Sequence, residues 1–250
     1  MKIKFLNSHK FYLNLVLQRT GHFTELTGIN GKKALSEWMK TGDSNQIIEL
    51  LRNKEVLREY LKICSDSARS EADIIFDLVG KNGVSLANSN VLSIGCGNGI
   101  IELMLFHIAK NSNQKITELT LVDSEDSSDV KGFGYKEEAA SYASLSDTLL
   151  FLKNNFVDSD ICLYNPFKHT LPPKKYSLIF SLLAMGFHFP LDGYMDYICE
   201  NVSYKGLLIF DCRKGTNQDS LDELFNNFKL IARSDHGKFE RITLQNDRKG

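Results

Sequence analysis

The stretch Val91–Glu102, VLSIGCGNGIIE, decides the fold of this chain. Its apolar start, Val91–Ile94, predicts a buried strand, and three glycines follow within five residues, at positions 95, 97 and 99. The run IIELMLFHIAK, from Ile100 onward, has the length and apolar content of a helix. A strand, a glycine-rich turn and a helix in this order place bare backbone at the carboxyl end of the strand, where a ligand can approach it closely.

The spacing of the glycines separates three kinds of ligand. A nucleoside-triphosphate P-loop requires GxxxxGK[ST], and neither Lys-Ser nor Lys-Thr follows these glycines. The dinucleotide fingerprint GxGxxG requires glycine where this chain has Ile100. The methionyl end of S-adenosylmethionine needs close backbone approach, and this cofactor carries no pyrophosphate. The loop therefore favours S-adenosylmethionine over NAD, and a tight turn in an unrelated α/β protein is the remaining alternative.

From Val91 onward, short apolar runs alternate with helical stretches, which is typical of a parallel α/β sheet. Two further apolar runs near the end are joined only by His236-Gly237, a connection so short that the pair must be antiparallel. The predicted fold class is thus α/β: a Rossmann-like, doubly wound, mostly parallel sheet with a terminal antiparallel hairpin. The predicted strands are residues 91–95, 116–123, 161–165, 176–182, 206–212, 228–235 and 238–246, and the predicted helices are residues 100–110, 137–155, 192–202 and 217–228.

Residues 1–88 are predicted to form a helical cap or extension in front of a cofactor-binding domain of residues 89–250. Apolar residues recur three and four apart between Ile47 and Ile63, which indicates an amphipathic helix, and Gly80 and Gly83 mark its end. Such an extension either closes over the carboxyl edge of the sheet and excludes water, or provides the surface of a homodimer.

The composition limits the possible partners. The 250 residues are 42% hydrophobic and 24% charged with a net charge of -1, which argues against a nucleic-acid partner. Because no 18 apolar residues run together and no leader pattern is present, we expect no membrane partner and a cytoplasmic location. Five scattered cysteines without a CxxC pair suggest reduced thiols. The dispersed histidines predict no metal site, with Asp192 and Asp211 as the only candidate ligands.

With the glycine loop and the later run LTLVDSE, residues 88–245 resemble the class I S-adenosylmethionine-dependent methyltransferases. In that family the loop lines the methionine and ribose of the cofactor, and an acid at the end of the second strand binds the ribose hydroxyls. The resemblance assigns that acid to Asp123, whose carboxylate can accept two hydroxyl hydrogen bonds. The terminal hairpin, which dehydrogenases usually lack, agrees with the family. The implied cofactor residues are Gly95, Cys96, Gly97, Asn98, Gly99, Asp123 and Ser124.

Two positions depart from the family pattern. Many members have Asp or Glu where this chain has Ser93, so a supporting contact to the loop is expected to be missing. Many members also place an acid near the adenine amino group after the third strand, where this chain offers Asn165. Asn165 either pairs with adenine through its amide or only shapes the turn before Pro166. Ser181, at the end of the fourth strand, is a further expected cofactor residue.

The substrate side is expected in SLLAMGFHFPLDGYMDYI, residues 181–198, since class I enzymes place substrate and catalytic residues after the fourth strand. His188 is the candidate catalytic base, because a group with a pKa near 7 can remove the proton of an attacking hydroxyl; its alternative role is packing among aromatic residues. Tyr194 and Arg213 are the candidate substrate residues, and Arg213 is alternatively a solvated surface side chain. Asp192 is expected to cap the following helix.

Residues 126–155, which include Tyr135 and Tyr142, and residues 180–198 are similar to bacterial sugar O-methyltransferases of surface (capsule) polysaccharide clusters. The [DNS]PP[YF] tetrapeptide of DNA and amide N-methyltransferases does not follow the fourth strand. The sequence therefore predicts S-adenosylmethionine-dependent O-methylation of a small polar molecule or a sugar or glycan precursor, with S-adenosylhomocysteine as the second product. An NAD-dependent oxidoreductase and a non-catalytic, cofactor-binding scaffold of the same fold are the alternatives.

Overall fold

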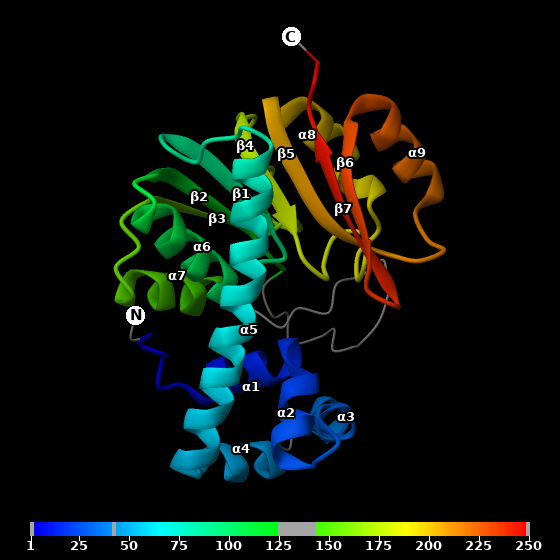
Figure 1. Cartoon of the computed structure of the whole chain (residues 1–250). Helices are drawn as coiled ribbons and strands as arrows, with labels where there is room; N and C mark the ends of the chain where they lie inside the picture. Colours follow the sequence, from blue (N-terminus) through cyan, green and yellow to red (C-terminus); the bar gives the residue numbers. More distant parts are fainter. Residues whose placement is uncertain (1–2, 42–43, 125–143, 249–250) are drawn as a thin grey trace.

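The computed structural model describes residues 3–41, 44–124 and 144–248, and its centre is a seven-stranded sheet of order β3-β2-β1-β4-β5-β7-β6. The strands β1 to β5 are parallel, and β7 is antiparallel to both β5 and β6 (Figure 1). All seven predicted strands and the terminal hairpin are confirmed. Their bounds are β1 Ser89–Ile94, β2 Ile116–Val122, β3 Asp160–Tyr164, β4 Tyr176–Ser181, β5 Val202–Arg213, β6 Lys229–Asp235 and β7 Phe239–Gln245.

The strand order reverses at β1. The chain passes from β1 outward to β2 and β3 and then returns to place β4 on the other side of β1. Ser93 near the end of β1 is in register with Leu121 of β2 and Phe180 of β4, so the loops after these strands leave the sheet at one level. In an open α/β sheet a ligand binds at the carboxyl ends of the strands beside such a reversal. The glycine loop follows β1 and therefore occupies this position.

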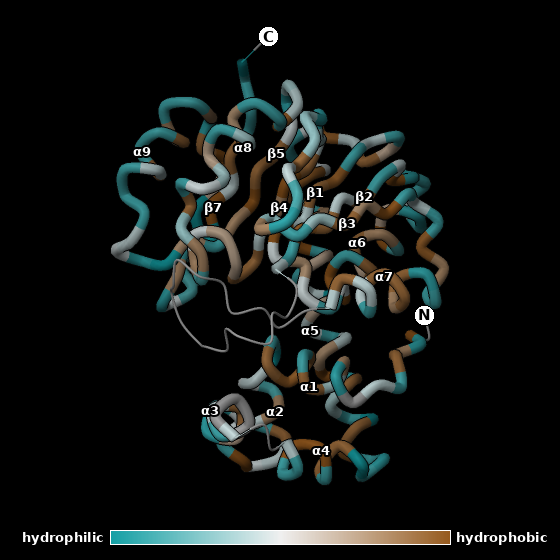
Figure 2. The backbone as a smooth tube through the Cα atoms, turned by 180° about the vertical axis from the view of Figure 1, so that it is seen from behind, coloured by the Kyte–Doolittle hydropathy of each residue, from teal (hydrophilic) through white to brown (hydrophobic). Residues whose placement is uncertain are grey.

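Helices cover both faces of the sheet because alternate residues of each strand point to opposite sides. In β4, Leu178 and Phe180 join the core formed with α5, α6 and α7, whereas Ile179 joins the core formed with α8 and α9. Figure 2 shows hydrophobic residues concentrated along the strands and hydrophilic residues on outer segments such as α9. The helix bounds are α5 Lys54–Lys81, α6 Ile100–Asn111, α7 Leu145–Asn154, α8 Met195–Asn201 and α9 Gln218–Asn227.

The N-terminal extension consists of four short helices and the first half of α5, and it gathers beyond the carboxyl ends of the parallel strands (Figure 1). Tyr60 of α5 packs edge-on against Phe23 and donates a hydrogen bond to the Leu15 carbonyl at 3.1 Å. The other end of α5 packs on α6, so this helix joins the extension to the sheet. The short helices are α1 His9–Gln18, α2 Thr20–Thr27, α3 Gly31–Thr41 and α4 Asn45–Arg52. No helix in the described ranges is long and apolar enough to cross a membrane.

Two predicted helices differ in the structure. The amphipathic segment breaks at Asn53, whose side chain caps α5 by accepting hydrogen bonds from the backbone amides of Glu55 and Val56. The helix predicted at 192–202 divides into a 3₁₀ turn, Asp192–Tyr194, and α8. Asp192 therefore does not cap α8, and this prediction was wrong: its side chain is exposed and accepts a hydrogen bond from the adjacent Gly193 amide at 2.8 Å. Residues 125–143, including Tyr135 and Tyr142, lie outside the described residues.

Candidate active site

The glycine loop has a left-handed backbone that brings neighbouring segments into close contact. At Gly95, φ is +78°, and an added Cβ would lie 2.1 Å from the Cβ of Ala184 in the loop after β4. At Gly97, φ is +55°, and an added Cβ would lie 2.6 Å from Nε2 of Gln18 in α1. Glycine is therefore favoured at both positions by conformation, and at Gly95 also by space, whereas the end of the Gln18 side chain could shift away from a Cβ at position 97. The loop lies between the segment that carries His188 and the N-terminal extension.

Asp123 directly follows β2 and faces this loop. Its Oδ2 accepts a hydrogen bond from the backbone amide of Gly97 at 2.7 Å, and its own amide donates to the Tyr164 carbonyl of β3 at 3.2 Å. Part of its surface stays exposed, yet desolvation raises the pKa of its carboxyl group to about 6, against the opposing effect of the amides of Gly97 and Ser124. The predicted acid thus lies beside the predicted loop.

The carboxylate that position 93 lacks is supplied by α6. Ser93 donates a hydrogen bond to Oε1 of Glu102 at 2.5 Å, and the Glu102 side chain is almost completely buried. Desolvation raises the pKa of Glu102 to about 7, and the Ser93 hydrogen bond opposes this shift. A buried acid therefore lies at the end of β1, although from another element than the family pattern suggests. The signal for it was an acidic residue within the otherwise apolar start of α6.

Helix α1 also contacts the loop, which the sequence reasoning missed. The Asn98 side chain donates to the Phe11 carbonyl at 3.1 Å, and the Asn98 amide donates to Oε1 of Gln18 at 3.3 Å. Thr148 of α7 donates to the Gly97 carbonyl at 2.7 Å. No local sequence pattern indicates the contacts of Asn98, because they join residues 80 or more positions apart.

The remaining predicted cofactor residues shape the backbone around the loop. Oδ1 of Asn165 accepts a hydrogen bond from the Phe167 amide at 3.0 Å, so this side chain does form the turn around Pro166. The fully buried Ser181 hydroxyl accepts from the Met185 amide at 2.9 Å and closes the first turn after β4. Cys96 is buried, and desolvation holds the pKa of its thiol well above the usual value, so it stays a neutral thiol. A cofactor contact by these residues stays a prediction.

His188 lies in a tight turn of the loop that follows β4. The Ala184 carbonyl accepts hydrogen bonds from the amides of Phe187, His188 and Phe189 at 3.1, 2.8 and 3.0 Å. The His188 ring meets the Phe187 ring edge-on, with centroids 4.8 Å apart. Since Ala184 also touches Gly95, the turn that carries His188 is anchored directly on the glycine loop. The aromatic contact of the packing alternative is present, and a catalytic role of His188 stays a prediction.

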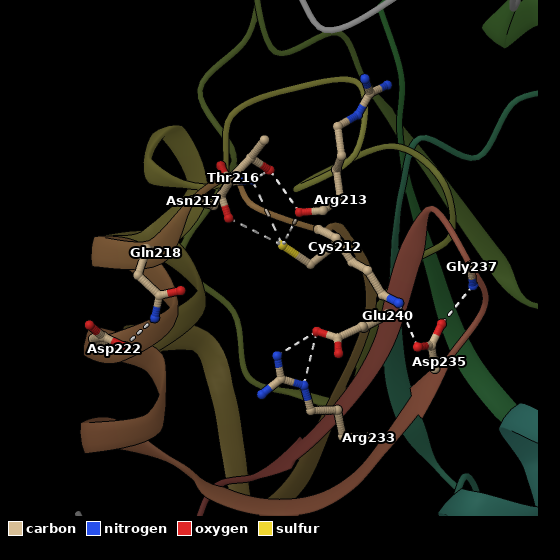
Figure 3. A network of polar contacts seen from close by, with 11 residues as sticks. Cys212, Arg213, Thr216, Asn217, Gln218, Asp222, Arg233, Asp235, Gly237 and Glu240 are labelled. Atoms are coloured by element: carbon tan, nitrogen blue, oxygen red, sulfur yellow. Dashed lines mark hydrogen bonds and ion pairs between the residues drawn. The ribbon is translucent and has the colours of Figure 1, made fainter.

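Arg213 and Tyr194, the predicted substrate residues, come from neighbouring elements. The Arg213 guanidinium lies 4.7 Å from the centroid of the Phe187 ring, and Figure 3 shows it pointing away from the polar contacts of Cys212 and Asn217. Its Nε is buried and has no hydrogen-bond partner among the described residues. Desolvation, with a smaller effect of the Asp123 charge, raises the pKa of Tyr194 to about 12. Tyr194 is therefore within electrostatic range of Asp123, and Arg213 lies beside the turn that carries His188.

Asn217 ties this turn to the segment after β5. Its Oδ1 accepts from the Leu191 amide at 3.0 Å, and its Nδ2 donates to the Gly186 carbonyl at 3.1 Å. The amide of Arg213 donates to the same Gly186 carbonyl at 3.0 Å. The two ends of the segment 186–191 are thus held from one side, which positions His188 between them.

Asp211, one of the two metal ligands considered, is already paired. Its carboxylate receives hydrogen bonds from Nε and Nη2 of Arg241 at 2.7 and 3.0 Å and from the Leu183 amide at 3.2 Å. Arg241 also forms an ion pair with Glu71 of α5. Across the parts of the chain that the structure describes, no group of three or more His, Cys, Asp or Glu side chains is placed to hold a metal ion.

Comparison with known proteins supports the fold. No family model and no curated protein matches the sequence. Among solved structures, a proposed class I S-adenosylmethionine-dependent methyltransferase from Listeria monocytogenes has 12% identity and a TM-score of 0.54, and the match covers 96% of this chain and 88% of that chain. Magnesium protoporphyrin IX methyltransferase from Synechocystis, solved with bound S-adenosylmethionine, has 10% identity and a TM-score of 0.47, over 71% and 79% of the two chains. The first match confirms that this chain has the Rossmann-like fold of class I methyltransferases.

Proposed function

We propose that this protein is an S-adenosylmethionine-dependent methyltransferase that methylates an oxygen of a small polar molecule or a sugar or glycan precursor. The observation that carries the proposal is the Asp123 carboxylate, held by the Gly97 amide at 2.7 Å beside the glycine loop. This contact brings together, at the reversal of strand order, the two features that the resemblance assigns to cofactor binding.

The polar atoms around the loop fit this cofactor. Oγ of Ser124 and Nε2 of Gln18 are both buried, and neither has a hydrogen-bond partner among the described residues. A buried polar atom without a partner is costly, about 1–3 kcal/mol, so such atoms indicate a ligand that supplies the missing partner. Ser124 directly follows Asp123, whose carboxylate meets the Gly97 amide, and the Gln18 side chain lies against Gly97, so both residues belong to the surroundings of the loop. The ribose hydroxyls and the methionyl group offer hydrogen-bonding partners of the required kinds.

When bound, S-adenosylmethionine supplies a methyl group on a positively charged sulfur, and S-adenosylhomocysteine is the leaving product. The protein has to hold the two reactants in line, and alignment alone is worth about 7–11 kcal/mol. Asp123 orients the ribose, while Tyr194 and Arg213 orient the acceptor. His188 accepts the proton of the acceptor hydroxyl as its oxygen attacks the methyl carbon. Helix α1, which closes against the loop, limits the access of water.

Two features of the chain support a small polar acceptor. The net charge of -1 offers no general attraction for a polyanion such as a nucleic acid. Arg213 provides a planar cation beside the turn of His188, and its Nε, which has no hydrogen-bond partner among the described residues, suits an anionic or hydroxylated acceptor. The similarity of residues 180–198 to sugar O-methyltransferases makes a sugar the first class of acceptor to examine.

Titration calorimetry with S-adenosylmethionine, S-adenosylhomocysteine and NAD tests the cofactor. We expect binding of the first two, weaker binding of both by Asp123→Asn, and no heat with NAD. Absence of heat with both sulfur compounds would overturn the proposal, and tight binding of NAD would favour the oxidoreductase alternative.

The second experiment measures transfer of a labelled methyl group from S-adenosylmethionine to a panel of hydroxylated sugars. Transfer would show that the protein is an enzyme and not a non-catalytic, cofactor-binding scaffold. With the acceptor found in this way, His188→Ala should lower kcat by about 10²-fold or more and remove the lower-pH limb of the rate profile. An unchanged rate and profile would assign His188 to packing alone.

A further inference from the structure

The side-chain amide of Gln18, at the end of α1, contacts the glycine loop at both Gly97 and Asn98. Oε1 of Gln18 accepts the Asn98 amide at 3.3 Å, which identifies the oxygen end of the side chain and leaves Nε2 as the donor. An added Cβ on Gly97 would lie 2.6 Å from Nε2, so this donor lies against the loop backbone beside the Gly97 amide that Asp123 holds.

Nε2 of Gln18 is buried and has no acceptor among the described residues. The Asn98 amide already occupies Oε1, so Nε2 is the end of this side chain that still needs a partner. A buried donor of this kind favours a ligand group that accepts a hydrogen bond.

The groups of the proposed cofactor differ in what they can accept. The methionyl ammonium only donates hydrogen bonds, whereas the methionyl carboxylate only accepts them. Among the charged groups of the cofactor, the carboxylate is therefore the one that can pair with Nε2. The ribose hydroxyls also accept hydrogen bonds, but the proposed function assigns them to Asp123.

We propose that Gln18 is a cofactor-binding residue whose Nε2 donates to the methionyl carboxylate, so that the N-terminal extension completes the cofactor site. This inference rests on the proposed function, since it presumes S-adenosylmethionine as the ligand. It assigns a role to the first helices of the chain beyond covering the sheet edge. It also gives a reason for the close contact between the Gln18 side chain and the backbone of Gly97.

The test compares two ligands in Gln18→Glu. This variant keeps an oxygen for the Asn98 amide and replaces the Nε2 donor by a second oxygen. The ligands are S-adenosylhomocysteine and 5′-methylthioadenosine, which retains adenine and ribose but lacks the amino-acid end. Calorimetry should show a loss of affinity for S-adenosylhomocysteine of about tenfold or more, with the affinity for 5′-methylthioadenosine unchanged. Gln46→Glu, an exposed position on α4, is the matched control for the change of charge and should leave both affinities unchanged.

Each outcome bears on one of the two proposals. If the wild-type protein binds neither S-adenosylmethionine nor S-adenosylhomocysteine, the proposed function fails. If it binds them and Gln18→Glu binds S-adenosylhomocysteine as tightly as Gln46→Glu does, only the role of Gln18 is overturned. Equal weakening of both ligands would place Nε2 on the ribose and overturn the carboxylate assignment. Unchanged binding of 5′-methylthioadenosine, together with the melting temperature of the ligand-free protein, shows that the variant site is folded.

Discussion

The contact between Gly95 and Ala184 couples the glycine loop to the turn that carries His188, and Gly95→Ala tests this coupling. The new methyl group would lie 2.1 Å from the Ala184 Cβ, far inside van der Waals contact, and Ala184 is itself buried. The substitution also places a Cβ on a residue whose φ is +78°. Both effects should destabilise the protein, and they can be separated.

The left-handed conformation costs alanine about 1–2 kcal/mol, and the insertion of a methyl group into a packed contact costs about 1–3 kcal/mol. Gly95→Ala should therefore lower the free energy of unfolding by about 2–5 kcal/mol. Gly237→Ala is the matched control, because φ there is +77° and nothing lies within 4 Å of the added Cβ. It should cost only the conformational part, about 1–2 kcal/mol.

Urea unfolding followed by circular dichroism measures both variants. The double variant Gly95→Ala with Ala184→Gly removes the clash, so it should recover about 1–3 kcal/mol relative to the sum of the single variants. Two results would refute the coupling: a Gly95→Ala cost no larger than that of Gly237→Ala, or additivity in the double variant.

Three further predictions concern charged groups. Asp123→Asn should weaken S-adenosylmethionine binding about 10- to 100-fold in calorimetry, because hydrogen bonds to a charged group contribute about 1.5–3 kcal/mol; unchanged affinity would remove Asp123 from the site. The pKa of Glu102 is raised from 4.5 to about 7, so the folded protein binds the proton of this carboxyl group more tightly than the unfolded chain does. The free energy of unfolding should therefore fall as pH rises from about 4.5 to above 7. Urea unfolding should show that Glu102→Gln gains about 3 kcal/mol over wild type between pH 4 and pH 8, whereas a constant difference would contradict the buried acid. Arg241→Met leaves the fully buried Asp211 unpaired and should cost about 3–5 kcal/mol in the same assay, against less than about 1 kcal/mol for the exposed Arg233→Met; equal costs would show that burial does not matter at this pair.

The fold could be predicted from the sequence because its signals are local. Each strand is a short apolar run between polar or glycine-rich residues, and the hairpin follows from the length of the His236-Gly237 connection. The position of Asp123 at the end of the second strand could be predicted in the same way, whereas its role toward a cofactor came from the family resemblance and stays a prediction. The confirmed strands and the hairpin are elements whose structure is indicated by residues that are close together in the sequence.

The missed contacts depend on tertiary packing. Gln18 meets Asn98 only because α5 folds the extension back over the sheet edge, and no spacing in the sequence encodes this contact. The break at Asn53 was hidden because the apolar period continues on both sides of it. At Asp192 the capping preference of aspartate, worth about 1 kcal/mol, is outweighed by the surrounding loop, in which Asn217 fixes the Leu191 amide.

The three glycines of the loop each admit a different part of the chain, which bears on how the motif is to be interpreted. Added Cβ atoms would meet Ala184 at position 95, Gln18 at position 97 and Thr148 at position 99. Packing alone therefore accounts for part of the GxGxG spacing, and the glycines by themselves do not identify a ligand. The ligand is indicated by what packing leaves over: the Asp123 carboxylate at the loop and the partnerless buried atoms of Gln18 and Ser124. Asp123 is held at the loop by the Gly97 amide, and the two buried atoms have no hydrogen-bond partner among the described residues, so these three groups carry the argument for a cofactor.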